Sequence, residues 1–169
     1  PEGLLRCVES ILECREAIDL NVKPVVALDA MAAGGLRFEH CFSAPLCGPS
    51  RALCLTGRYA FRTGVVDNAT GALATPQSET LIAKVLQQAG YATAAAGKWR
   101  QLQYFSTAAD GQKWGFDEFL VWGAGGADRG HRYWDPDLNH NGKTMLGTRG
   151  KFGPDVLHEF VADFARRHQ

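Results

Sequence analysis

The feature that most constrains the fold of this chain is a helix followed at once by a strand. Residues 75–90, TPQSETLIAKVLQQAG, carry apolar side chains at helical spacing, with Thr75 or Ser78 as the cap and Gly90 as the stop. Residues 91–97, YATAAAG, are small and suit a strand buried between layers. A helix that leads directly into a strand is typical of α/β proteins, so we expect a sheet flanked by helices. The apolar stripe expected to face the core consists of Leu81, Ile82, Val85 and Leu86.

Other segments complete this α/β pattern. Pro49 and Gly57 bracket a short helix over 49–55, because proline suits the first turn of a helix and glycine the residue after its end. The remaining expected elements are helices over 4–18 and 25–33, strands over 36–43 and 116–122, a hairpin that turns at Asn141 and Gly142, and a final helix over 154–167.

Length and charge narrow the class of protein. With 169 residues we expect a single domain, 1–169, in which 1–24 form an atypical N-terminal segment. Eighteen basic residues balance 18 acidic ones, so no overall field draws the chain to nucleic acid or to an anionic membrane. Since no apolar run is long enough, we expect no membrane-spanning helix. Glutamates at positions 2, 9, 13 and 16 interrupt the first twenty residues, so we expect no signal peptide in this sequence. These features leave the cellular compartment open.

The stretch CGPSRALCLTGR, residues 47–58, has the most unusual chemistry. Cys47 precedes an expected helix, whose free N–H groups and dipole favour negative charge. Arg51 lies one turn further along the same face and adds a fixed positive charge. A thiolate nucleophile is one interpretation, but the neighbours of Cys47 match neither the cysteine loop of tyrosine phosphatases nor a cysteine protease. The five cysteines also lack the spacing of a metal site.

This stretch resembles a long family signature. The sulfatase signature reads C-x-P-S-R-x-x-x-L-T-G-R, and its fixed positions correspond to Cys47, Pro49, Ser50, Arg51, Leu55, Thr56, Gly57 and Arg58. Residues 90–99, GYATAAAGKW, are similar to the second sulfatase signature, in which Gly-Tyr-x-Thr leads to Gly-Lys-Trp. The likeness covers about 25–167 in the same order. The chain therefore resembles a partial N-terminal catalytic domain of an arylsulfatase-like, formylglycine-dependent sulfatase.

The resemblance implies an alkaline-phosphatase-like α/β fold, incomplete in this chain, and a sulfuric ester hydrolase. In this family a formylglycine-generating enzyme reads the motif that here is Cys47, Pro49, Ser50 and Arg51, and it oxidises the cysteine to formylglycine (3-oxoalanine). The hydrated aldehyde attacks the sulfur of a sulfate ester, expels the alcohol and later releases sulfate. The implied partner is thus a sulfated small molecule or a sulfated glycan.

The resemblance also assigns roles in the site. Cys47, Arg51 and Lys98 are the implied catalytic residues, of which Arg51 steadies the hydrated aldehyde and Lys98 contacts the sulfate. Arg100 stands where the family has a histidine, and it can bind sulfate but cannot exchange a proton at neutral pH. The family's divalent ion, usually Ca²⁺, would contact Cys47 as formylglycine. No further metal ligands are identifiable, because the paired aspartates that precede the cysteine in the family are not found.

Two other interpretations stay open. A catalytically incompetent remnant of a sulfatase would bind sulfated ligands through Arg51, Lys98 and Arg100 without turning them over. A phosphatase-like hydrolase would use the same architecture, since sulfate and phosphate esters share a tetrahedral geometry. The cysteine motif argues against the phosphatase.

Overall fold

The computed structural model describes residues 40, 42–99, 102–122, 131–145 and 148–168. The chain divides into two compact units, Pro1–Phe42 and Ser43–Gln169, and every element described below belongs to the second. The helices expected over 4–18 and 25–33, and most of the strand expected over 36–43, lie outside the described residues. That the whole chain forms one domain with an atypical N-terminal segment stays a prediction.

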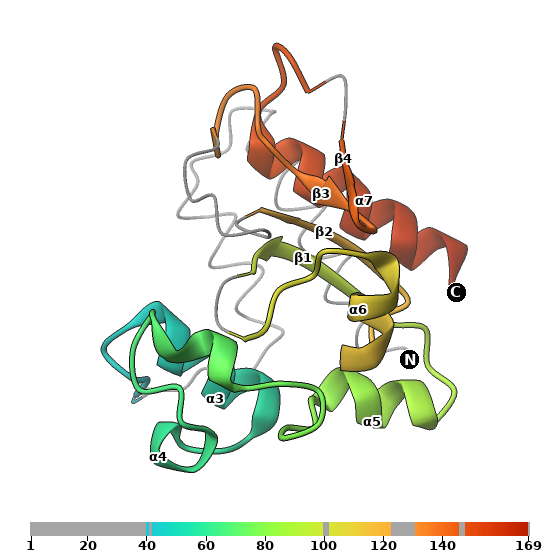
Figure 1. Cartoon of the computed structure of the whole chain (residues 1–169). Helices are drawn as coiled ribbons and strands as arrows, with labels where there is room; N and C mark the ends of the chain where they lie inside the picture. Colours follow the sequence, from blue (N-terminus) through green and yellow to red (C-terminus); the bar gives the residue numbers. More distant parts are fainter. Residues whose placement is uncertain (1–39, 41, 100–101, 123–130, 146–147, 169) are drawn as a thin grey trace. The chain divides into compact units, whose positions relative to one another are not determined.

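A four-stranded mixed sheet in the order β1-β2-β3-β4 organises the second unit (Figure 1). Strand β1 (Ala94–Lys98) is parallel to β2 (Glu118–Trp122). Strand β3 (Asn139–His140) pairs antiparallel with both β2 and β4 (Lys143–Thr144). The two longer strands confirm the strands predicted from the sequence, and their parallel pairing directs both carboxyl ends toward the same edge of the sheet.

A two-residue turn joins β3 to β4. Asn141 and Gly142 have φ angles of 51° and 86°, as the tight hairpin turn requires. The side-chain oxygen of Asn141 also accepts a hydrogen bond from the backbone N–H of Phe119 at 2.7 Å, which ties the hairpin to β2. The hairpin predicted at these two residues is confirmed.

Helices cover both faces of this sheet. The described helices are α3 (Cys47–Thr56), α4 (Ala60–Thr63), the 3-10 helix η1 (Thr70–Leu73), α5 (Ile82–Gln88), α6 (Ala108–Trp114) and α7 (Gly153–Arg167). Phe119 and Val121 of β2 are buried in a core shared with α3, α5 and α6, whereas Leu120 packs with Val156 of α7. Alternation along one strand therefore supplies two hydrophobic cores, one on each face.

Three helices predicted from the sequence are confirmed, although their ends differ. The helix predicted over 49–55 is α3, which begins two residues earlier, and the one predicted over 154–167 is α7. Within 75–90 only α5 is helical, and no side chain caps its first turn. The predicted cap at Thr75 or Ser78 is wrong, because these two residues hydrogen-bond to each other in the turn before α5.

The apolar stripe of α5 is buried only in part. Leu81 and Ala83 are buried, but Ile82 and Val85 are 59% and 55% exposed. The reason is the close approach of α5 to Gly115, where an added Cβ would lie 2.4 Å from the backbone of Lys84. This contact turns the side of α5 around residues 83 and 84 toward the core, and the rest of the stripe faces away.

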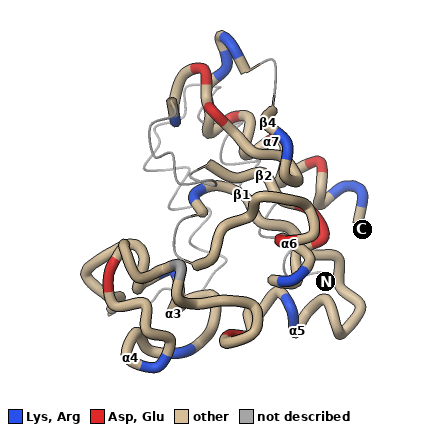
Figure 2. Tube along the Cα trace, in the orientation of Figure 1, with Lys and Arg blue, Asp and Glu red and all other residues tan. Residues whose placement is uncertain are grey.

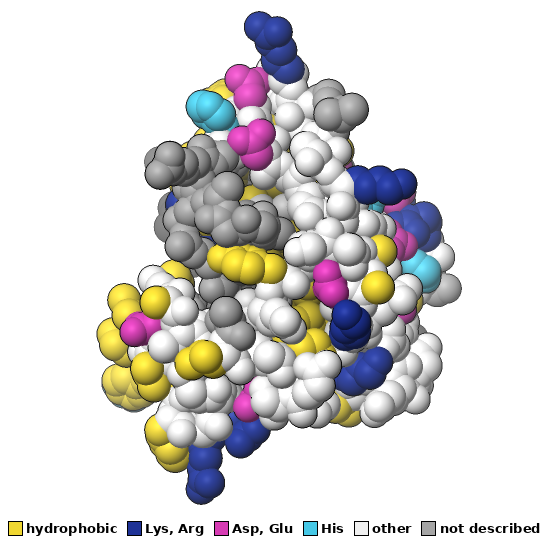
Figure 3. Space-filling model, viewed as in Figure 1, with side chains coloured by type: hydrophobic (Ala, Val, Ile, Leu, Met, Phe, Trp, Pro, Cys, Tyr) yellow, Lys and Arg dark blue, Asp and Glu magenta, His cyan; other side chains and the backbone are white. Residues whose placement is uncertain are grey.

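The described surface is mixed in character. Lysine, arginine, aspartate and glutamate residues are spread over the described elements (Figure 2). Apolar side chains are exposed around α4 (Figure 3), where Tyr59 and Phe61 stack with their ring centres 5.7 Å apart. Among the described helices, none has the length and apolar character needed to cross a membrane.

Candidate active site

The side chains of Cys47 and Lys98 meet, although 51 residues separate them in the chain. The Nζ atom of Lys98 donates a hydrogen bond to the Sγ atom of Cys47 at 3.2 Å. Lys98 is the last residue of β1, so its amine leaves from the carboxyl end of the parallel strand pair, where α/β sheets commonly bind ligands. Cys47 is the first residue of α3, whose N-terminal dipole favours negative charge. The site therefore combines a strand end with a helix start.

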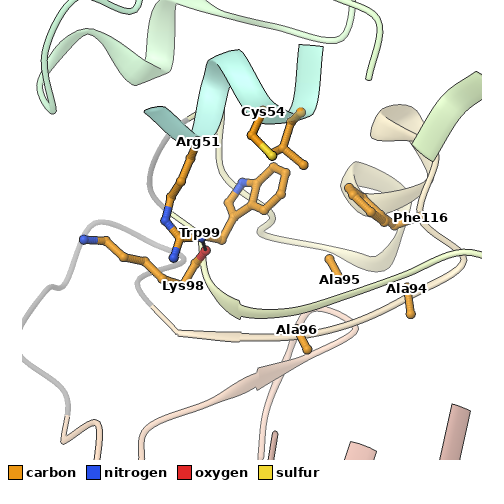
Figure 4. A pocket seen from close by; sticks show the side chains of 9 residues that line it. Arg51, Cys54, Ala94, Ala95, Ala96, Lys98, Trp99 and Phe116 are labelled. Carbon is orange, nitrogen blue, oxygen red and sulfur yellow. Dashed lines mark hydrogen bonds between the residues drawn. The ribbon is translucent and has the colours of Figure 1, made fainter. Parts of the chain in front are cut away.

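Arg51 joins the site from the next turn of α3. Its Nη1 atom donates to the backbone carbonyl oxygen of Lys98 at 3.3 Å. Figure 4 shows the two cationic side chains next to each other at one end of a cavity of about 280 Å³. The other residues that line this cavity are Cys54, Leu55, Ala94, Ala95, Ala96, Trp99 and Phe116. Two cationic side chains that line one cavity favour an anionic ligand.

The amine of Lys98 also lies over an aromatic ring. Its Nζ atom is 5.5 Å from the centre of the Trp122 ring, and the Cζ atom of Arg132 is 4.5 Å from the same ring. Trp122 is the partner of Lys98 in the parallel register of β1 and β2. Cation–π attraction to the ring restricts where the amine can go. The parallel pairing thus helps to keep Lys98 directed at Cys47.

These contacts change the acidity of Cys47. The hydrogen bond from Lys98 and the positive charge of its amine lower the pKa of the exposed thiol, and the backbone N–H of Gly48 lowers this pKa further. Positive charge near a thiol favours its anionic form. The same surroundings would stabilise negative charge on any ligand bound beside residue 47.

Alkylation of the unmodified protein tests this arrangement. We expect Cys47 to react with iodoacetamide at a lower pH than an ordinary thiol, and we expect Lys98→Ala to raise the pH midpoint of that reaction. Mass spectrometry of the tryptic peptide 38–51 measures the reaction, with fragment ions that separate Cys47 from Cys41. Lys113→Ala, which removes an exposed lysine of α6, is the control. An equal midpoint in the Lys98→Ala and Lys113→Ala variants would contradict the contact.

Other residues of the cysteine motif support the fold around the site. Pro49 is buried in the first turn of α3, where a missing N–H breaks no helical hydrogen bond. The Ser50 hydroxyl donates to the carbonyl oxygen of Ala44 at 2.6 Å. The Nη1 atom of Arg58 contacts both carboxylate oxygens of Glu79, at 2.9 and 2.8 Å, and the Glu79 side chain is only 3% exposed. Arg58 therefore anchors the end of the motif to the segment before α5.

Sequence reasoning did not identify all the side chains at this site. Asn68 contacts Cys47 from the loop before η1, the ring of Trp122 lies next to the amine of Lys98, and Arg132 lies over the same ring. None of the three belongs to either signature. The one available signal was the position of Trp122 at the end of the strand predicted over 116–122. Parallel pairing of that strand with the one predicted over 91–97 would place Trp122 near Lys98.

The described residues can accommodate the expected formylglycine, but they do not provide a ligand set for the expected Ca²⁺. Formylglycine fits at position 47, because the side chain is exposed and has polar partners in Lys98 and Asn68. Within the described residues, no three histidine, cysteine, aspartate or glutamate side chains gather to hold a metal ion. We therefore assign no step to Ca²⁺, which stays an expectation of the family. Arg100 lies outside the described residues, and its sulfate-binding role stays a prediction.

Comparison with known proteins identifies the family. The family model for sulfatases matches residues 19–167, so the chain belongs to the sulfatase family. It is 37% identical over 138 residues to N-acetylglucosamine-6-O-sulfatase of Bacteroides thetaiotaomicron, a match that covers 81% of this chain and 22% of that protein. It is 49% identical over 82 residues to arylsulfatase G of Rattus norvegicus, which covers 47% and 16%. The chain thus spans less than a quarter of the length of these relatives.

Solved structures agree with the family assignment. BT4656 in complex with its substrate D-glucosamine-2-N,6-O-disulfate matches with a TM-score of 0.67 and 31% identity, over 84% of this chain and 26% of that chain. Ps i-CgsB matches with a TM-score of 0.59 and 27% identity, over 73% and 31%. The predicted fold is confirmed: an alkaline-phosphatase-like α/β domain, incomplete in this chain, with a mixed sheet flanked by helices.

Proposed function

We propose that this chain forms the part of a sulfatase active site that carries the nucleophile and holds the sulfate group of a sulfate ester. The observation that carries the proposal is the 3.2 Å hydrogen bond between Lys98 Nζ and Cys47 Sγ. Arg51 supports it by donating a hydrogen bond to the backbone carbonyl oxygen of Lys98. Hydrolysis of a sulfate ester develops negative charge on the sulfuryl oxygens. Fixed cationic donors stabilise such charge most when they are in place before the reaction.

The side chain at position 47 is proposed to act as formylglycine, which supplies a nucleophilic oxygen toward sulfur. Lys98 would hold that side chain and the sulfate together, because its amine has more than one proton to donate. Arg51 would keep Lys98 in place through the backbone carbonyl and add positive charge at the opening. The exposed Cys47, followed by Pro49, Ser50 and Arg51, supports recognition by a formylglycine-generating enzyme.

A sulfated amino sugar is the substrate class that we propose. Two comparisons support it, since a curated relative is an N-acetylglucosamine-6-O-sulfatase and the solved structure of BT4656 holds a disulfated glucosamine as its substrate. The likeness to arylsulfatase G also makes aryl sulfates suitable test compounds. Compounds of both classes are sulfate esters of ring-containing alcohols or phenols.

One observation favours a second candidate function, the binding of sulfated ligands without turnover. Arg100 keeps its proton at neutral pH, so it cannot deliver a proton to the leaving alcohol as an imidazolium could. Ligand binding without release of sulfate, in protein whose residue 47 has been modified, would favour this alternative.

The function is tested by sulfate release from glucosamine-6-sulfate and from an aryl sulfate, with the matching phosphate esters as comparison. The full-length protein should be expressed with a formylglycine-generating enzyme. We expect the sulfate esters to be hydrolysed in preference to the phosphates, and we expect Cys47→Ala to abolish sulfate release because it removes the reacting side chain. Sulfate release that persists in the Cys47→Ala variant, or preferred turnover of the phosphates, would contradict the proposal.

A further inference from the structure

Among the described residues, the side chain of Cys47 forms side-chain hydrogen bonds with two residues, Lys98 and Asn68. The Oδ1 atom of Asn68 accepts a hydrogen bond from Cys47 Sγ at 3.2 Å and another from the backbone N–H of Gly48 at 2.8 Å. Helix α3 has no side-chain cap at its own N-terminus. A residue 20 positions away therefore satisfies one of the free N–H groups of the first turn.

The loop that carries Asn68 is held in place by its neighbours. The Oδ1 atom of Asp67 accepts hydrogen bonds from the N–H groups of Ala69 and Thr70, both at 2.8 Å. The hydroxyl of Thr70 in turn accepts from the N–H groups of Val66 and Asp67, at 3.0 and 3.1 Å. These reciprocal bonds on both sides of Asn68 fix the backbone from which its side chain reaches α3.

Gly48 shows how closely Asn68 packs on the start of α3. A Cβ atom added at Gly48 would lie 2.8 Å from Asn68 Oδ1 and 3.1 Å from the carbonyl oxygen of Asp67. Real Cβ atoms essentially never come within 3.0 Å of another atom, so the carboxamide oxygen occupies the space that a larger residue would need. The absence of a side chain at position 48 allows Asn68 to reach both the helix N–H and the side chain of residue 47.

We propose that Asn68 is a positioning residue of the active site, whose carboxamide oxygen orients the side chain at position 47. The sulfur of Cys47 accepts a hydrogen bond from Lys98 and donates one to Asn68, and a hydroxyl can likewise accept one hydrogen bond and donate another. The thiol thus stands in for an oxygen of the modified residue. A carboxamide accepts a hydrogen bond without taking the proton, so Asn68 orients the nucleophilic atom and is not a base. The catalytic meaning of this placement rests on the proposed function.

Two variants of Asn68 test the inference, each against the same change at Asn139. Asn139 is a matched control, because its side-chain oxygen likewise accepts from a backbone N–H, that of Gly142, but it lies in β3. Asn68→Asp keeps the acceptor and adds a negative charge beside the sulfur. In the unmodified protein we expect it to raise the pH midpoint of Cys47 alkylation by about one pH unit or more. In the modified protein we expect Asn68→Ala to lower kcat by about ten- to a hundredfold with little change in KM.

The two readouts separate this inference from the proposed function. An alkylation midpoint in Asn68→Asp equal to that in Asn139→Asp would overturn the placement of Asn68. A kcat in Asn68→Ala equal to that in Asn139→Ala would overturn its positioning role. If the unaltered protein shows no turnover, the proposed function fails, and the alkylation midpoint still decides whether Asn68 orients residue 47. Thermal unfolding of each variant identifies any general loss of structure.

Discussion

Replacement of Lys98 by alanine is expected to lower kcat for sulfate ester hydrolysis by about a hundredfold or more, because loss of one preorganised donor to developing negative charge has an effect of that size. Lys98 donates directly to the side chain of residue 47 and lines the same cavity as Arg51. We expect both kcat and kcat/KM to fall, since the interaction strengthens as charge develops. Steady-state kinetics with a sulfated glucosamine measures the effect.

Two further variants show whether the effect belongs to the amine of Lys98. Lys98→Arg keeps the positive charge but replaces the compact amine by a planar group, so it should recover only part of the lost rate. Lys113→Ala removes a lysine whose ion pair with Asp110 lies on the surface, and it should leave the rate unchanged. Wild-type kcat in Lys98→Ala would contradict the site that we describe.

The second large effect concerns stability. Arg58→Ala is expected to lower the free energy of unfolding by about 3 kcal/mol, because it leaves the carboxylate of Glu79 buried without its cationic partner. The pair joins the residues that follow α3 to the segment before α5. Without the pair, α3, which carries Cys47, should therefore also be held less firmly in place. Urea denaturation of the wild-type and variant proteins measures the difference.

Two comparisons show whether the loss of stability in Arg58→Ala comes from the buried charge of Glu79 or from the loss of an ion pair alone. Arg58→Ala combined with Glu79→Gln should be more stable than Arg58→Ala alone, because the neutral amide leaves no buried charge. Arg167→Ala removes a similar two-oxygen contact with Glu118, but that carboxylate is 22% exposed, so its effect should be clearly smaller. Equal losses in Arg58→Ala and Arg167→Ala would show that burial of Glu79 has no special importance.

Local sequence patterns predicted α3, α5, β1, β2, the β3–β4 hairpin and α7. They did not predict α4, η1 or α6, and they misplaced the start of α5. The strands near 94–98 and 118–122 were predictable, because short apolar runs between turn residues suit buried strands. The start of α5 was not predictable, because Thr75 and Ser78 satisfy the local rule for a cap but use their hydroxyls within a turn. The orientation of α5 depends instead on contact with Gly115, which is distant in the sequence.

The candidate active site also depends on contacts between residues that are distant in the sequence. The two signatures singled out Cys47, Arg51 and Lys98, and the structure brings these three residues together. Asn68 and Trp122 contribute through contacts that follow from the folded arrangement of the loop before η1 and of β2. No local spacing marks such contacts. The sequence therefore indicates the residues that we propose to react, while the residues that contact them become visible only in three dimensions.

The most direct test of the account is the chemical identity of residue 47. The full-length protein should be expressed with a formylglycine-generating enzyme and digested with trypsin, and the peptide 38–51 analysed by mass spectrometry. We predict that sulfur is replaced by oxygen at position 47, with two hydrogens fewer, while Cys41 in the same peptide keeps its sulfur. An unaltered thiol at position 47 in every preparation would contradict this prediction.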